Sequence, residues 1–224
     1  DANQTCDLSG WVAGAGWPRD ETNHWSVGTR FAGQGFIQNH AAQLRKEDPC
    51  WVYDGYGNTW DQSIIARYRG PNAQLSFDFL SDSELGFDFV TVEADSLCRP
   101  QPGPASSRRL LFTTSGPNPS GRITTLALPD FGVPDSVHCV YIRFSSDAAY
   151  SDEDGLYPSL FAAGLVVDHI AVTGSLAYTE DFEGPGINPN IDLVCSAPDL
   201  SGSLFARLQH HPPDTDPAGE DTTC

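Results

Sequence analysis

Short segments in which apolar and polar residues alternate are the feature that most constrains how this chain folds. In residues 73–80 the apolar side chains of Leu75, Phe77 and Phe79 fall on every second position. A period of two predicts an extended strand with one buried and one polar face. Residues 87–93 continue the alternation but carry apolar side chains on both faces, which predicts a strand in the interior of a sheet.

The rest of the chain extends this pattern to seven or eight strands. The 21 glycines and 17 prolines are scattered between short apolar runs, which leaves little room for long helices. At 224 residues the chain is long enough for one large sandwich and a tail. We therefore expect an all-β fold, a two-sheet antiparallel β-sandwich of the jelly-roll kind. The further predicted strands are residues 63–68, 108–114, 123–128, 137–144 and 165–173.

The composition changes near the C-terminus. From residue 185 onward there are six acidic residues, one arginine and six prolines, with few apolar residues between them. Such a segment would barely fold alone. We predict a sandwich domain over residues 1–178 and an acidic, proline-rich tail over residues 179–224. The tail either packs on its own domain, docks on a neighbouring copy as an exchanged arm, or begins a second module.

Six widely separated cysteines indicate disulfides rather than a zinc knuckle or a redox motif, because no two form a C-x-x-C pair. An even number fits three bridges formed in an oxidising compartment. Six cysteines allow about 15 pairings, so the connectivity cannot be read from the sequence. The pairing that closes neighbouring segments is Cys6 with Cys50, Cys98 with Cys139, and Cys195 with Cys224.

The charge of the chain and the features of its N-terminus indicate where the protein is located and which small partners suit it. The chain begins at Asp1, contains no methionine, and has no apolar stretch of membrane-spanning length. We therefore expect an extracellular protein, secreted or on the cell surface. A formal charge of −18 repels nucleic acid and anionic lipid, and makes cations the natural small partners. The alternative interpretation is that the negative charge only keeps the protein soluble and binds no particular cation.

An acidic loop follows the predicted strand 137–144. It holds four carboxylates within eight residues, although not at the spacing of an EF-hand. Calcium binds oxygen ligands from loops of this kind, and close carboxylates repel one another without a counter-ion. A solvated acidic loop is the alternative interpretation. The predicted calcium ligands are Asp147, Asp152, Glu153, Asp154 and, from a later strand, Asp168, with Asp181 and Glu183 as second candidates.

The common catalytic motifs are missing. The chain contains no H-E-x-x-H, G-x-S-x-G, P-loop or G-x-G-x-x-G, and its histidines fall at no metal-ligand spacing. Aromatic residues in the first fifty positions either pack the core or form a carbohydrate-stacking platform, and core packing is the favoured interpretation. We expect no enzyme activity. These aromatic residues are Trp11, Trp17, Trp25, Phe31 and Phe36.

Four ordered motifs resemble a known family. They are Gly55 to Ser63, Leu75 to Phe77 with Gly86 to Glu93, Ile142 to Asp147 with Ser151 to Tyr157, and Val167 to Val172. Together they resemble the MAM-like modules attached to bacterial immune-inhibitor-A-type metallopeptidases and to other large secreted bacterial proteins.

The resemblance covers roughly residues 50–175 and implies a MAM-like, concanavalin-like jelly roll, export, a non-catalytic accessory role and calcium as a ligand. The family's acidic pair before the last strand is here Asp168-His169, which removes one oxygen ligand. The peptidase's own zinc motif is absent from this chain.

The leading functional hypothesis is a calcium-stabilised binding or adhesion module of a bacterial extracellular protein, with a surface glycan or a protein as ligand. The alternative is a structural subunit of an extracellular filament or surface assembly, in which residues 185–224 dock on the next copy. A polysaccharide-active enzyme that uses the aromatic N-terminal region is a third hypothesis. We expect neither nucleic-acid binding nor a membrane span.

Overall fold

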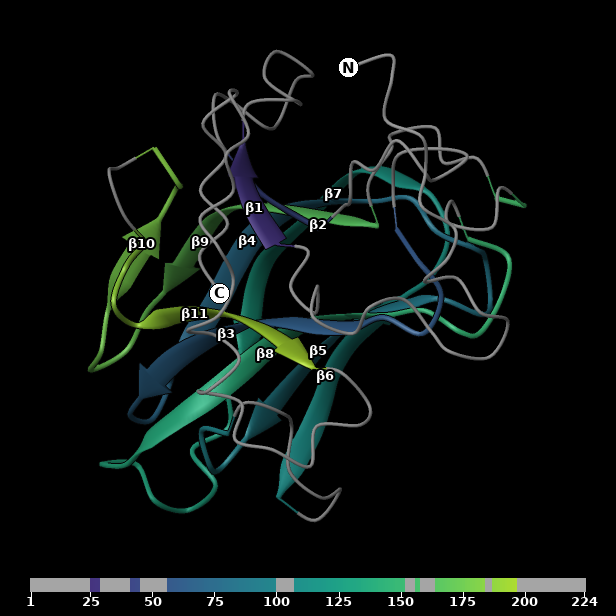
Figure 1. Ribbon diagram of the computed structural model, residues 1–224. Helices are drawn as coiled ribbons and strands as arrows, with labels where there is room; N and C mark the ends of the chain where they lie inside the picture. The colour runs from purple at the N-terminus through teal and green to yellow at the C-terminus, as the bar shows by residue number, and fades with distance from the viewer. Residues whose placement is uncertain are drawn as a thin grey trace, which may run out of the picture.

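A computed structural model provides the structure, which describes residues 25–28, 41–44, 56–99, 107–151, 156–157, 164–183 and 187–196 (Figure 1). This part of the chain contains strands and no helix, so the all-β prediction is confirmed. The strands are β1 (Trp25–Gly28), β2 (Ala41–Leu44), β3 (Asp61–Arg69), β4 (Gln74–Ser81), β5 (Phe89–Asp95), β6 (Arg108–Thr114), β7 (Asn118–Ala127), β8 (Val137–Ser145), β9 (Leu165–Val172), β10 (Tyr178–Glu180) and β11 (Ile191–Ser196).

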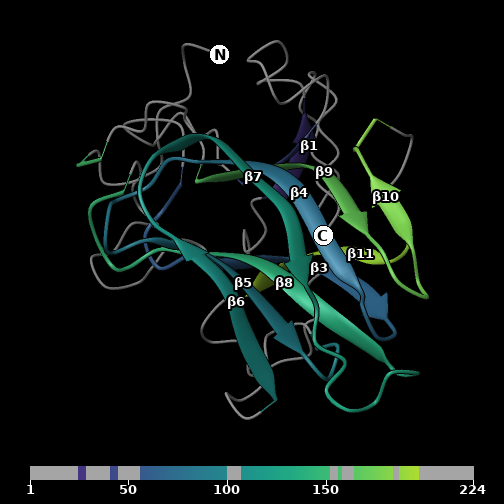
Figure 2. The ribbon, with the colours of Figure 1, turned by 180° about the vertical axis from the view of Figure 1, so that it is seen from behind.

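The strands form two antiparallel sheets. The first sheet has the order β1-β2-β9-β4-β7, with β10 added beside β9. The second sheet has the order β11-β3-β8-β5-β6. Figures 1 and 2 show the two sheets stacked face to face, which confirms the predicted β-sandwich.

All seven strands predicted from the sequence are present, as β3 to β9. Strand β5 lies between β8 and β6, in agreement with the apolar residues on both of its faces. The predicted tail contributes to the sandwich as well: β10 pairs with β9, and β11 pairs with β3 from Ile191 opposite Ala66 to Ser196 opposite Asp61. The sandwich therefore reaches at least to Ser196, beyond the boundary that we predicted after residue 178.

One continuous core lies between the sheets. The inward positions of β4 are Leu75, Phe77 and Phe79, as the alternation predicted, and each is at most 2% exposed. The second sheet faces them with side chains such as Ile142 and Phe144, which are fully buried. Burying a side chain of this size contributes roughly 1.5–3 kcal/mol, so this core is the main source of stability.

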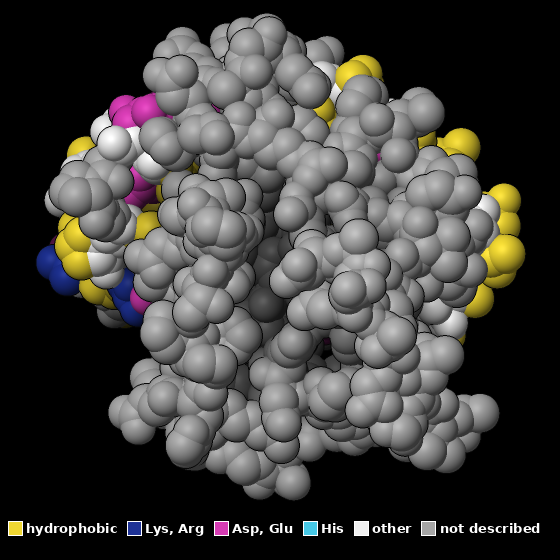
Figure 3. All heavy atoms as spheres, turned by 45° about the horizontal axis from the view of Figure 1, so that its top comes forward, with side chains coloured by type: hydrophobic (Ala, Val, Ile, Leu, Met, Phe, Trp, Pro, Cys, Tyr) yellow, Lys and Arg dark blue, Asp and Glu magenta, His cyan; other side chains and the backbone are white. Residues whose placement is uncertain are grey.

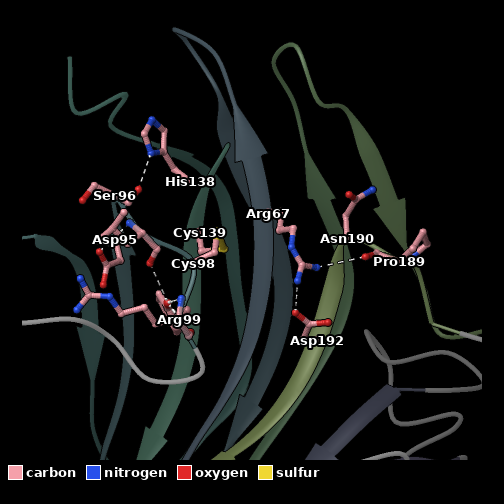
Figure 4. Close-up of a disulfide and its surroundings, with 12 residues drawn as sticks. Arg67, Asp95, Ser96, Cys98, Arg99, His138, Cys139, Pro189, Asn190 and Asp192 are labelled. Atoms are coloured by element: carbon pink, nitrogen blue, oxygen red, sulfur yellow. Dashed lines mark hydrogen bonds and ion pairs between the residues drawn. A yellow bond between two sulfur atoms is a disulfide. The ribbon is translucent and has the colours of Figure 1, made fainter. Parts of the chain in front are cut away.

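A disulfide fastens the β5–β6 connection to the outer face of the second sheet (Figure 4). Cys98 is bonded to Cys139 of β8, which confirms one predicted bridge. Two residues along β8, the hydroxyl of Tyr141 accepts a hydrogen bond from Arg99 N at 3.0 Å and donates one to Arg99 O at 2.8 Å. The segment after β5 is therefore held at two points. Of the other cysteines, Cys6, Cys50, Cys224 and the side chain of Cys195 lie outside the described residues.

Candidate functional site

Three connections meet at one end of the sandwich, on the right in Figure 1. They are the β4–β5 loop (residues 82–88), the β6–β7 turn (115–117) and the described parts of the β8–β9 loop (146–151 and 156–157). We call this region the loop end. The antiparallel topology places it there, because β4, β6 and β8 all run toward this end and β5, β7 and β9 all leave it.

Asp88 joins two of these loops. Its side chain is buried, although Asp88 directly follows the exposed residues 85–87 of the β4–β5 loop. Its Oδ1 accepts a hydrogen bond from Asp147 N at 3.0 Å, and its Oδ2 accepts one from Glu84 N at 3.1 Å. Burial raises the pKa of the Asp88 carboxyl, while hydrogen bonds from the Tyr56 hydroxyl and from the two backbone amides oppose that rise. Asp88 thus fixes the start of the predicted acidic loop.

Asp82 fixes the far end of the same loop. The hydroxyl of Tyr157 donates a hydrogen bond to Oδ1 of Asp82 at 3.0 Å, and Asp82 is fully buried. Tyr157 N also donates to the carbonyl of Ser151 at 3.2 Å, which brings the two sides of the loop together. The predicted ligands Asp152, Glu153 and Asp154 lie outside the described residues, between these two fixed points.

Two buried hydroxyls add oxygen atoms to the loop end. Ser83 and Ser151 are each 1% exposed, and their Oγ atoms find no hydrogen-bond partner within the part of the chain that the structure describes. Buried hydroxyls are ordinarily paired, because an unpaired one costs roughly 1–3 kcal/mol. Carboxylate, carbonyl and hydroxyl oxygens together are the donor types that hard cations bind.

The described carboxylates are not sufficient for a metal site. Among residues 56–99, 107–151, 156–157, 164–183 and 187–196, no group of three or more acidic, histidine or cysteine side chains is placed to hold a metal ion. A calcium ion at the loop end would therefore need ligands from residues 152–154. Asp147, the described member of the predicted set, is solvent-exposed in this loop.

Asp168 belongs to a second polar cluster, inside the first sheet. It lies on β9 opposite Asp78 of β4, and both carboxylates are buried. The ring Nδ1 of His169 is 3.1 Å from Asp78 Oδ2 and 3.4 Å from Asp168 Oδ2. His169 has φ of 51°, where the β4–β9 register shifts, and this turns its side chain toward the two acids. The structure thus separates Asp168 in β9 from Asp147 in the loop.

The second-rank candidates Asp181 and Glu183 form a turn after β10. Asp181 Oδ1 accepts a hydrogen bond from Glu183 N at 3.2 Å, while Phe182 between them is buried in the core. Both oxygens of Glu180 accept backbone amide hydrogen bonds, from Phe182 N and from Asn188 N, at 2.6 Å each. These acids therefore shape the approach to β11.

The sequence interpretation missed Asp82 and Asp88. Asp82 lies just after the predicted strand 73–80, and Asp88 lies within the predicted strand 87–93. The available signal is that the segment Asp82 to Asp88 carries three acids and no basic residue directly after a buried strand. Their role depends on a loop some sixty residues further along the chain, at Asp147.

The loops of the loop end also carry exposed apolar side chains. Leu85 is 72% exposed, Phe87 58%, Leu156 56% and Tyr150 46%. Figure 3 shows hydrophobic side chains along the right-hand rim, the side on which the loop end lies. Large apolar side chains gathered at one end of a protein commonly mark an interaction surface.

The fold and the loop end define this protein as a two-sheet antiparallel β-sandwich with an acidic, apolar-rimmed loop end. No protein-family model matches the chain, and a comparison with curated proteins found no match. The described residues contain no helix that is long and apolar enough to cross a membrane.

Proposed function

We propose that the protein is a non-catalytic, secreted, calcium-stabilised binding or adhesion module of the MAM-like kind that its sequence resembles. The observation that carries the proposal is the acidic loop 147–157, whose two ends are hydrogen-bonded to the buried carboxylates of Asp88 and Asp82. The sequence of this loop holds four acidic residues within eight positions, and close carboxylates repel one another unless a cation is bound.

Two further observations support the export and binding parts of the proposal. The Cys98–Cys139 disulfide fits a protein that folds in an oxidising compartment. The missing catalytic motifs and the exposed apolar rim favour binding over catalysis.

Calcium is expected to raise the melting temperature of the protein. A ligand that binds only the folded state stabilises it by about 2.7 kcal/mol at a hundred times its dissociation constant. For a domain of this size that free energy corresponds to roughly 5–10 °C. Differential scanning calorimetry in calcium and in chelator measures the shift.

Two variants make this experiment specific. The triple variant Asp152→Asn/Glu153→Gln/Asp154→Asn should lose the calcium response. The variant Asp130→Asn/Asp135→Asn, which removes acids from the β7–β8 connection, should keep it. Identical melting curves of the wild type in calcium and in chelator would refute the calcium site.

A structural subunit is the second candidate function, because a strand of the predicted tail, β11, is the edge strand of a sheet. This strand comes from the predicted tail and lies at the edge of the second sheet, where Arg67 pairs with Asp192 and Arg67 Nη1 donates a hydrogen bond to Pro189 O at 3.2 Å (Figure 4). The same contacts would form if β11 were donated by a neighbouring copy. Light scattering should then show a mass that grows with concentration, whereas a strict monomer at high concentration excludes a filament.

A further inference from the structure

The loop end carries apolar side chains that are exposed to solvent. Leu85 packs against Gly116 in the β6–β7 turn. The contact is close, because a Cβ atom added to Gly116 would lie only 2.9 Å from Leu85 Cδ1. Tyr150 contacts the ring of Tyr157 at a centroid distance of 6.1 Å, and Tyr157 is hydrogen-bonded to Asp82. Contacts of this kind limit the freedom that Leu85 and Tyr150 would lose on binding, which favours them as anchors.

The charge of the loop end is of one sign. Its described residues, 82–88, 115–117, 146–151 and 156–157, contain four acidic residues and no lysine or arginine, and of the four Glu84 and Asp147 are not buried. One calcium ion would neutralise only part of this charge. Opposite charge on a partner speeds its approach and selects it against other partners, so the flanking residues of the partner should be basic.

We propose that the loop end binds a cationic, amphipathic protein segment, whose apolar side chains contact Leu85, Phe87, Tyr150 and Leu156 and whose lysines and arginines face the carboxylates of Glu84 and Asp147. This inference rests on the proposed binding function and names its partner class. The negative charge that attracts such a segment disfavours nucleic acid and anionic lipid at the same surface.

The test uses a fluorescein-labelled amphipathic peptide of leucine and lysine, titrated with the full chain and followed by fluorescence anisotropy. We expect binding that weakens as ionic strength rises, and none of the matching leucine–glutamate peptide. The variant Leu85→Ser/Phe87→Ser keeps the net charge and should weaken binding by about tenfold or more. The control variant Leu110→Ser/Val133→Ser changes two equally exposed apolar residues elsewhere and should bind as the wild type does.

Three results would overturn the inference. The first is equal binding of the basic peptide by the wild type and by Leu85→Ser/Phe87→Ser. The second is no binding by the wild type at low ionic strength. The third is capture of phosphatidylcholine vesicles by the wild type but not by this variant, without any peptide binding, which would assign the surface to a membrane. The calcium shift in melting temperature, measured on the same variants, shows separately whether the calcium site fails.

Discussion

The Phe144→Ala variant is expected to lose about 3–5 kcal/mol of unfolding free energy, the largest effect of any single substitution considered for this protein. Phe144 is fully buried near the loop end of β8 and meets the ring of Tyr56 edge-on at a centroid distance of 5.3 Å. A Cβ atom at Gly164 would lie 2.9 Å from its Cζ, so the backbone of the β8–β9 connection also closes on this ring. Removal of the ring leaves a cavity that rigid sheets cannot fill.

Urea unfolding followed by tryptophan fluorescence measures the loss. Phe87→Ala is the matched control, because it is the same substitution at a residue that is 58% exposed, and it should change stability by less than about 0.5 kcal/mol. Similar unfolding midpoints for the two variants would show that Phe144 does not carry the packing assigned to it.

The double variant Cys98→Ala/Cys139→Ala is expected to be less stable than the wild type by about 2–4 kcal/mol. The bridge closes a segment with a sequence separation of 41, and its loss lets the unfolded chain sample more conformations. The replacement by alanine avoids a buried hydroxyl at Cys139, which is fully buried.

Both proteins should be unfolded in the same oxidising buffer, so that the remaining four cysteines are treated alike. Chemical denaturation gives the difference in free energy. An unchanged unfolding midpoint would mean that the bridge adds no stability, and that the hydrogen bonds between Tyr141 and Arg99 alone fasten the segment after β5.

The strands that the sequence predicts best are those whose burial alternates. In β4 the core face is occupied by Leu75, Phe77 and Phe79, so apolar residues recur at every second position of the sequence. The start of β5 is predicted less well: the alternation begins at Phe87, but the strand begins at Phe89 because Asp88 turns inward to bind the loop after β8. The alternation of neighbouring residues gives no sign of a hydrogen bond from an amide that lies far along the chain, such as that of Asp147.

Strands β10 and β11 could not be predicted for a related reason. Strand β10 has three residues, too few for a pattern, and β11 follows Pro189 in an acidic segment. Both depend on partner strands already in place, β9 and β3. The Cys98–Cys139 bridge was predicted because it closes a neighbouring segment, and it forms because the register places Asp95, three residues before Cys98, opposite Cys139.

The pairing of β11 with β3 also sets a condition on how the protein folds. Arg67 and Asp192, which form an ion pair between the two strands, are separated by 125 positions in the sequence. Contacts of such separation form late, because the chain must first close a long loop. While the chain is synthesised from its N-terminus, β3 therefore has an open edge until almost the whole sandwich has been made. That interval is when an open edge is exposed to pairing with other chains.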